Sequence, residues 1–132
     1  MTENSEQAAR SVLAMLEESL ATHNVDQVMA FWTDDAVLIA DADENFDGAA
    51  TAEYLGHMAD MPRTVRWQWD QVAVVLDAPG LLSFTAAGNM GFHDASGQLL
   101  QDRGRFRVTC LAVEGPAGWR LKHFHGSAPR AD

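Results

Sequence analysis

Residues 65–76 read VRWQWDQVAVVL, and from this point the chain changes from a helical to a sheet-forming pattern. Three further stretches rich in alternating apolar and β-branched residues follow, at 81–92, 99–113 and 119–127. Turn-forming residues, such as DAPG at 77–80, separate them. The second half of the chain therefore predicts four long antiparallel strands, with Gly88 and Gly91 marking bulges or strong bending in the second of them.

The first third of the chain predicts two helices. Capping-box spacing begins at Asn4, and apolar residues then recur every three or four positions. The same spacing begins again at Asn24 and leads into a shorter apolar stripe that ends at Trp32. We therefore expect a first helix that ends near Thr22 and a second that runs to Trp32.

The segment between these helices and the sheet is mixed. Turn residues at 33–35 precede a short strand at 36–40, the acidic stretch 41–48 (DADENFDG) predicts a loop, and 49–59 suits a third helix. Three helices followed by antiparallel strands make an α+β fold, in which the helices cover one face of the sheet. The length predicts one domain over 1–132.

The alternation within the strands assigns side chains to faces. In the last strand, the side that carries Leu121 also carries His123 and His125, so both histidines should point toward the helices. In the preceding strand three arginines alternate with apolar residues: Arg103, Arg105 and Arg107. Unless a bulge reverses the alternation, these arginines lie on the outer face of the sheet.

The charge is large and uneven. The formal net charge is -10, and residues 1–62 hold thirteen acidic side chains against the single Arg10. A surface that binds nucleic acid or anionic lipid needs clustered basic residues, so neither partner is expected. Cys110 is the only cysteine, no apolar run is long enough to span a membrane, and the polar N-terminus is unlike a secretion signal. We expect a cytoplasmic protein.

The order of these features resembles the nuclear transport factor 2-like superfamily. The residues that carry the resemblance are FWTDDA at 31–36, Asp-Gly at 47–48, Gly-Arg-Phe at 104–106 and WRLKHFHGSAP at 119–129. Within the superfamily the chain is similar to SnoaL-like domains and to the association domain of calcium/calmodulin-dependent kinase. The resemblance implies a cystatin-like α+β barrel: a cone-shaped, curved mixed sheet around a pocket that the helices close. It also implies a homodimer through the outer sheet face.

One activity of the superfamily is disfavoured. Ketosteroid isomerases place an Asp at the end of the first strand and a Tyr in the first helix. The corresponding positions here hold Ala40 and about Leu16, which cannot supply a base or a hydrogen-bonding acid. Asp41 lies one residue later and could act only if the strand is locally bulged.

His123 and His125 are candidate catalytic residues, with Asp41 as their carboxylate partner. Either histidine could act as a general base or bind a ligand, because histidine titrates near neutral pH. The alternative is a pair of core histidines held by hydrogen bonds. The spacing supplies two ligands for a metal ion but no third, so we predict neither a metal nor a cofactor.

Other residues could line the pocket. The predicted ligand-binding set combines two tryptophans with four polar residues: Trp32, Tyr54, Trp67, Asn89, His123 and His125. The tryptophans could equally fill the core. The arginines at 103, 105 and 107 could bind an anionic ligand, although ion pairs within the sheet or across a dimer are favoured. Cys110 should pack as a small hydrophobic residue.

Three functions fit the sequence. The first is binding of a small apolar or carbonyl-containing molecule in a hydrophobic pocket, without assured catalysis. The second is a polyketide cyclase, dehydratase or isomerase that uses His123 or His125 with a carboxylate. The third is an oligomeric assembly module.

Overall fold

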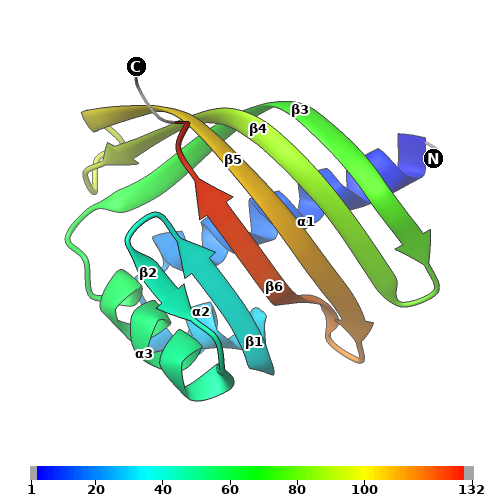
Figure 1. Ribbon diagram of the computed structural model, residues 1–132. Coiled ribbons are helices and arrows are strands. Elements are labelled where there is room, and N and C mark those ends of the chain that lie inside the picture. The colour runs from blue at the N-terminus through cyan, green and yellow to red at the C-terminus, as the bar shows by residue number, and fades with distance from the viewer. Residues whose placement is uncertain (1–2, 130–132) are drawn as a thin grey trace.

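The computed structural model describes residues 3–129 as one curved sheet with helices on one side (Figure 1). The elements follow the chain in this order: α1 (Glu3–Ala21), α2 (Val25–Ala30), β1 (Trp32–Ala40), β2 (Asp43–Asn45), α3 (Gly48–Ala59), β3 (Thr64–Ala78), β4 (Leu81–His93), β5 (Leu99–Gly115) and β6 (Gly118–Ser127). The predicted α+β fold is confirmed. Among the described residues, no helix combines the length and the apolar character needed to cross a bilayer.

The sheet is mixed, with strand order β2-β1-β6-β5-β4-β3. β1 runs parallel to β6, and every other neighbouring pair is antiparallel. Figure 1 shows α1 lying across one face of the sheet, while α2 and α3 lie beside β1 and β2. The first and last thirds of the chain therefore meet at β1 and β6, and the helices close one end of the curved sheet.

The beginning of the first strand differs from the sequence prediction. β1 starts at Trp32 rather than at residue 36, and the expected turn at 33–35 lies within the strand. Backbone pairing with β6 overrides the turn propensity, since the Leu121 N–H donates to the Phe31 carbonyl at 2.8 Å. A register shift between Trp32 and Val37 absorbs the polar residues.

The other local differences are small. α1 already includes Asn4, so this residue is not the N-cap that its spacing predicted. The acidic segment contains the short strand β2 rather than being loop throughout. The predicted cap at Asn24 is confirmed, because its side chain accepts a hydrogen bond from the Gln27 N–H at 3.1 Å. Asp47 caps α3 in the same way, and Gly48 follows it where a Cβ would lie 1.9 Å from the Asp34 carbonyl oxygen.

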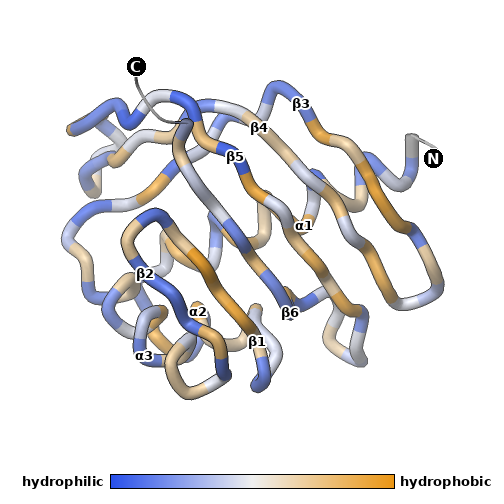
Figure 2. The backbone as a smooth tube through the Cα atoms, viewed as in Figure 1, coloured by the Kyte–Doolittle hydropathy of each residue, from blue (hydrophilic) through white to orange (hydrophobic). Residues whose placement is uncertain are grey.

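The core lies between α1 and the inner face of the sheet. Figure 2 shows hydrophobic stretches along strands such as β1 and β3 and hydrophilic turns between strands. Phe84 and Leu121 are completely buried, and Cys110 is 1% exposed. Burial raises the pKa of the Cys110 thiol, because the surrounding apolar side chains disfavour the thiolate. The prediction that Cys110 packs as a small hydrophobic residue is confirmed.

A bulge in β6 reverses the predicted direction of both histidines. Leu121 pairs with Ala112 and His123 pairs with the adjacent Leu111, so Lys122 is an extra residue in β6. Leu121 and Phe124 are both buried in the core, and His123 and His125 lie on the opposite, outer face. The expectation that these histidines point toward the helices is therefore wrong, because one inserted residue shifts the alternation by one position.

A second bulge moves one of the arginines. Met90 pairs with Gly104 and Gly91 pairs with Asp102, which leaves Arg103 as the extra residue in β5. Gly104 has φ +73°, a backbone conformation that glycine adopts without strain. Arg105 and Arg107 remain on the outer face as predicted, but Arg103 does not: it lines the space between the sheet and the helices.

Candidate ligand-binding cavity

A mostly apolar cavity of about 470 Å³ lies between the inner face of the sheet and the helices. Side chains from α1, α3 and all six strands meet there, with Asp43 as the contribution of β2 and Phe124 as that of β6. Six large side chains form much of its wall: Trp32, Leu38, Leu55, Trp67, Phe106 and Phe124.

The aromatic side chains of the wall contact one another. Trp67 stacks on Trp69 with ring centroids 5.7 Å apart and an interplanar angle of 20°. Trp67 also lies 6.3 Å from Phe106, and Trp32 packs edge-on against Phe124 at 6.0 Å. These contacts fix the planes of both cavity-lining tryptophans before any ligand enters.

Both of these tryptophans carry an unused hydrogen-bond donor. The Nε1 atoms of Trp32 and Trp67 are buried and have no partner among residues 3–129. Trp32 is only 4% exposed, so water does not readily replace the missing acceptor. A buried donor without a partner costs about 1–3 kcal/mol. Both donors belong to side chains that line the cavity, so a small rotation of either indole toward an acceptor on a bound molecule would satisfy it.

One side of the cavity mouth is acidic. Asp41 and Asp43 lie at the hairpin between β1 and β2, and both line the cavity with Tyr54 of α3. Burial raises the pKa of the Tyr54 phenol, and the negative charges of Asp43 and Asp41 raise it further. Tyr54 is therefore a neutral phenol near pH 7. Asp41 also accepts a hydrogen bond from the Ala128 N–H at 3.0 Å, which ties β1 to the segment after β6.

The other side of the mouth is basic. The guanidinium carbon of Arg63 lies 4.1 Å from the centre of the Phe92 ring, and that of Arg103 lies 5.8 Å from the same centre. All three residues line the cavity. The mouth thus carries carboxylates on one side and guanidinium groups on the other.

The structure brings three of the predicted ligand-binding residues to the cavity: Trp32, Tyr54 and Trp67. Their role in binding remains a prediction. Asn89 is exposed on the outer face, where it pairs with Gln68 and Arg105. The expectation that Asn89 lines the pocket is wrong, because the inward positions beside it belong to Gly88 and Met90.

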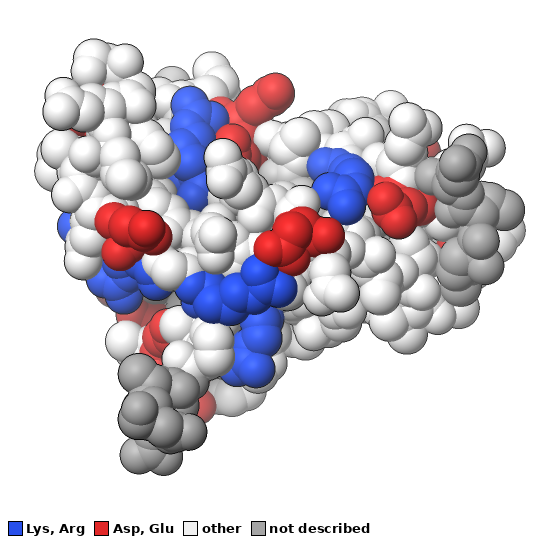
Figure 3. All heavy atoms as spheres, turned by 90° about the horizontal axis from the view of Figure 1, so that it is seen from above, with Lys and Arg blue, Asp and Glu red and all other residues white. Residues whose placement is uncertain are grey.

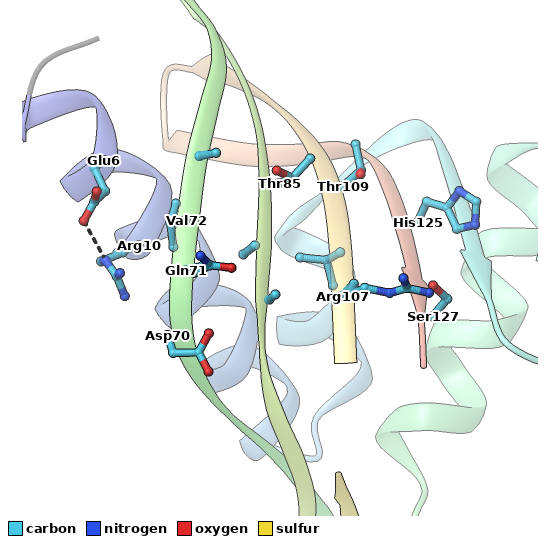
Figure 4. Close-up of a pocket in the computed structure, with 14 residues that line it drawn as sticks. Glu6, Arg10, Asp70, Gln71, Val72, Thr85, Arg107, Thr109, His125 and Ser127 are labelled. Atoms are coloured by element: carbon cyan, nitrogen blue, oxygen red, sulfur yellow. Dashed lines mark hydrogen bonds and ion pairs between the residues drawn. The ribbon is translucent and has the colours of Figure 1, made fainter. Parts of the chain in front are cut away.

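His123 and His125 lie on the outer face with different surroundings. Partial burial lowers the pKa of His123, and the charge of His125 lowers it further. His125 lines an open groove of about 720 Å³, which it shares with Arg107, Thr109 and Ser127. Figure 4 shows Arg107 extending toward Ser127 in this groove. The groove is larger than the cavity but more open and more polar, so the enclosed cavity is the better candidate for an apolar ligand.

Several basic residues of the outer surface are ion-paired. Arg105 binds Asp70 through two hydrogen bonds, at 2.5 and 3.1 Å, which lowers the pKa of Asp70 and raises that of Arg105. On the face seen in Figure 3, acidic side chains lie next to the basic ones. The predicted ion pairing of the strand arginines within the sheet is thus observed for Arg105.

Sequence reasoning missed the basic side of the mouth. Arg63 was assigned no role, and Phe92 was counted only as part of a strand. The one available signal for Arg103 was the glycine that follows it, since a glycine in a strand often marks a bulge. Among the described residues, no three His, Cys, Asp or Glu side chains come together as ligands for a metal ion.

A sequence profile of the SnoaL-like domain matches residues 9–131. The chain belongs to the SnoaL-like domain family. No curated protein matches it. This SnoaL-like domain is similar in structure to a candidate dehydratase of the nuclear transport factor 2-like family from Streptomyces avermitilis, at 11% identity over 98% of this chain and 99% of the other, with a TM-score of 0.77.

Two further solved structures share the fold. One is a candidate calcium/calmodulin-dependent protein kinase II association domain from Xanthomonas campestris, at 16% identity over 94% of this SnoaL-like domain and 87% of the other chain, with a TM-score of 0.76. Another, from Catenulispora acidiphila, was solved in complex with S-DNPA, at 14% identity, 92% and 90% coverage and a TM-score of 0.70. These likenesses confirm the nuclear transport factor 2-like fold, which other similar structures describe as cystatin-like.

Proposed function

We propose that the chain binds a small, partly aromatic molecule with a hydrogen-bond acceptor in the cavity between the sheet and the helices. The observation that carries this proposal is the aromatic wall of the cavity, in which both tryptophans, Trp32 and Trp67, also have an Nε1 donor without a partner that a small rotation of the indole could offer to a ligand. A carbonyl or carboxylate oxygen would accept from them, and the ring attached to it would contact the aromatic wall. The volume of about 470 Å³ lies within the range of small-molecule sites, roughly 300–1,000 Å³.

Binding is a better-supported proposal than catalysis. Ala40 and Leu16, which occupy the positions of the base and the phenol in ketosteroid isomerases, both line the cavity with apolar side chains. His123 and His125 lie on the other face of the sheet, so neither supports an acid–base step inside the cavity. An enzyme built on this cavity would have to use the ionisable groups that line it, such as Tyr54 or His57 of α3 with Asp41 or Asp43.

The outer sheet face supports a homodimer as part of the same proposal. On this face Val37 of β1, His123 of β6 and Leu111 of β5 lie side by side across three adjacent strands. In the edge strand β3, Leu76 is 44% exposed and Val75 is 62% exposed. Apolar side chains at such exposure favour burial against a second copy. Sedimentation of the native chain and of a Leu111→Lys variant tests this: we expect a dimer that the charge dissociates, and a native monomer contradicts it.

The binding proposal is tested with aromatic ketones and carboxylates in a thermal-shift screen, followed by titration. Satisfying one neutral donor is worth about 1 kcal/mol, so Trp32→Phe and Trp67→Phe should each weaken binding about fivefold. Trp119→Phe is the matched control, because Trp119 does not line the cavity. If no compound raises the melting temperature, or if the three variants bind alike, the proposal fails.

A further inference from the structure

The bulge in β5 brings Arg103 to the cavity mouth, where Arg103 and Arg63 share the ring of Phe92 as a neighbour. In a regular ladder Arg103 would share the outer face with Arg105, two residues further on. The register shift between Met90 and Gly91 instead turns Arg103 to the mouth, where both guanidinium groups lie against the ring of Phe92. Two like charges near one ring repel each other, and an anion bound close to both would relieve that repulsion.

No carboxylate of the described residues neutralises these two arginines. Elsewhere, Arg66 pairs with Glu17 at 3.2 Å and Arg105 pairs with Asp70 at 2.5 Å. Within residues 3–129, Arg63 has a single long hydrogen bond, 3.4 Å, to the neutral Gln101 side chain, and Arg103 has no ion pair. Both guanidinium groups thus retain donors for a ligand in the cavity that they line.

The carboxylates of the mouth do not bind them. Asp41 and Asp43 line the same cavity, yet neither lies within ion-pair distance of Arg63 or Arg103 in the described part of the chain. Asp41 already accepts a hydrogen bond from the Ala128 N–H. Both carboxylates lie close enough to Tyr54 of α3 for their charges to raise the pKa of its phenol. The two signs of charge are therefore separated across the mouth.

We propose that the cavity selects an aromatic carboxylic acid, whose carboxylate binds Arg63 and Arg103 while its ring enters the aromatic pocket beside Trp67. This inference rests on the proposed binding function and names its ligand class. Guanidinium groups bind carboxylates through paired, charge-assisted hydrogen bonds, which are about twice as strong as neutral ones. The chain as a whole carries a charge of -10, which repels anions, so selection for an anion must come from these local arginines.

The test is calorimetric titration at about pH 7 with four probes that share a ring system: 2-naphthoate, 2-naphthamide, 2-acetylnaphthalene and 2-naphthylmethylammonium, which are respectively anionic, neutral, neutral and cationic. The native chain should bind the carboxylate at least about tenfold more tightly than the amide and the ketone, because a charge-assisted contact is worth roughly 1.5–3 kcal/mol. Raised salt should reduce this preference.

Variants locate the selectivity. Arg103→Gln and Arg63→Gln should each bring the affinities for carboxylate and amide to within about twofold, while amide binding itself persists. Arg105→Gln is the matched control, since it removes an arginine from the same strand on the outer face, and its preference for the carboxylate should be unchanged.

Each result decides the inference. Equal binding of carboxylate and amide by the native chain overturns it and leaves the proposed function standing. Tighter binding of the cationic 2-naphthylmethylammonium shows that Asp41 and Asp43 dominate the mouth, which also overturns it. If none of the four probes binds, both the inference and the proposed function fail.

Discussion

The two ends of the layer between α1 and the sheet are built differently. At one end, α1 contributes Val12 and Leu13, and the strands contribute Phe84, Cys110 and Ala112, all at most 1% exposed. At the other end, α1 contributes Leu16 and Leu20, and the strands contribute cavity-lining residues such as Trp67 and Met90. The first end is filled and the second is hollow.

The difference shows where stability and recognition reside. At the filled end the side chains of α1 and of the strands pack directly against one another, as in other close-packed protein interiors. The hollow end contains the donors without partners, the Arg103 bulge and the charged mouth. We therefore expect substitutions at the filled end to change folding, and substitutions at the hollow end to change ligand binding.

The largest effect should follow from removing a ring at the filled end. Phe84→Ala should lower the free energy of unfolding by about 3–5 kcal/mol, because it leaves a void that the surrounding β-sheet cannot close. Met90→Ala at the hollow end should cost clearly less, because its side chain already borders empty space. Urea denaturation of both variants measures the contrast, and equal losses would show that the two ends are not packed differently.

A matched pair of enlargements tests the same contrast in the opposite direction. Ala112→Leu should cost about 1–3 kcal/mol by overpacking, since Ala112 is fully buried. Ala40→Leu adds the same atoms at a position that lines the cavity, so we expect little loss of stability and a marked loss of ligand affinity. Denaturation and titration of both variants give the two readouts. If Ala40→Leu destabilises as much as Ala112→Leu, the cavity is not empty space.

The acidic side of the mouth can be followed through its phenol. The chain has one tyrosine, so the absorbance of phenolate reports Tyr54 alone. Because its pKa in the folded protein is raised above the ordinary 10.0, the folded state holds this proton more tightly than the unfolded chain does. Stability should therefore fall as pH rises through about 10. Asp43→Asn should lower the pKa of Tyr54, because it removes a negative charge that raises it. An unchanged titration of the phenol would show that Asp43 does not interact with Tyr54.

The smallest effect belongs to the outer face. The pKa of His123 lies below its ordinary 6.5, so on acidification the unfolded chain binds this proton first. The contribution of His123 to stability is present above pH 6.5 and is lost as the pH falls through 6.5 toward the lower value of the folded state. His123→Gln should flatten this part of the pH–stability curve slightly. His125→Gln should raise the pKa of His123, which a histidine NMR titration measures.

Periodicity predicted the plan of the fold because the elements are long. The helical stripes and the four alternating strands each extend over enough residues for their period to be clear, and the segments at 31–36 and 119–129 carried the family resemblance. The beginning of β1 was not predictable in this way, since its pairing with β6 depends on residues far away in the sequence.

The positions of the strands were easier to predict than the face of the sheet to which each side chain points. Alternation counts residues, and one extra residue changes every assignment after it. Gly104 gave a local signal for the bulge at Arg103, but nothing near Lys122 marks the bulge that turns His123 and His125 outward. Trp32, Tyr54 and Trp67 line the cavity as expected, since the register shifts of β1 and β3 come after the two tryptophans and Tyr54 lies on a helix.

The buried thiol of Cys110 can report how often the filled end of the sheet opens. It is the only cysteine, it lies in the middle of β5 between β4 and β6, and its raised pKa keeps it protonated and unreactive while the strands stay together. A thiol reagent can therefore label the native chain only when this part of the sheet separates. The rate of labelling measures how often that happens, and a ligand at the hollow end should slow it only by stabilising the whole fold.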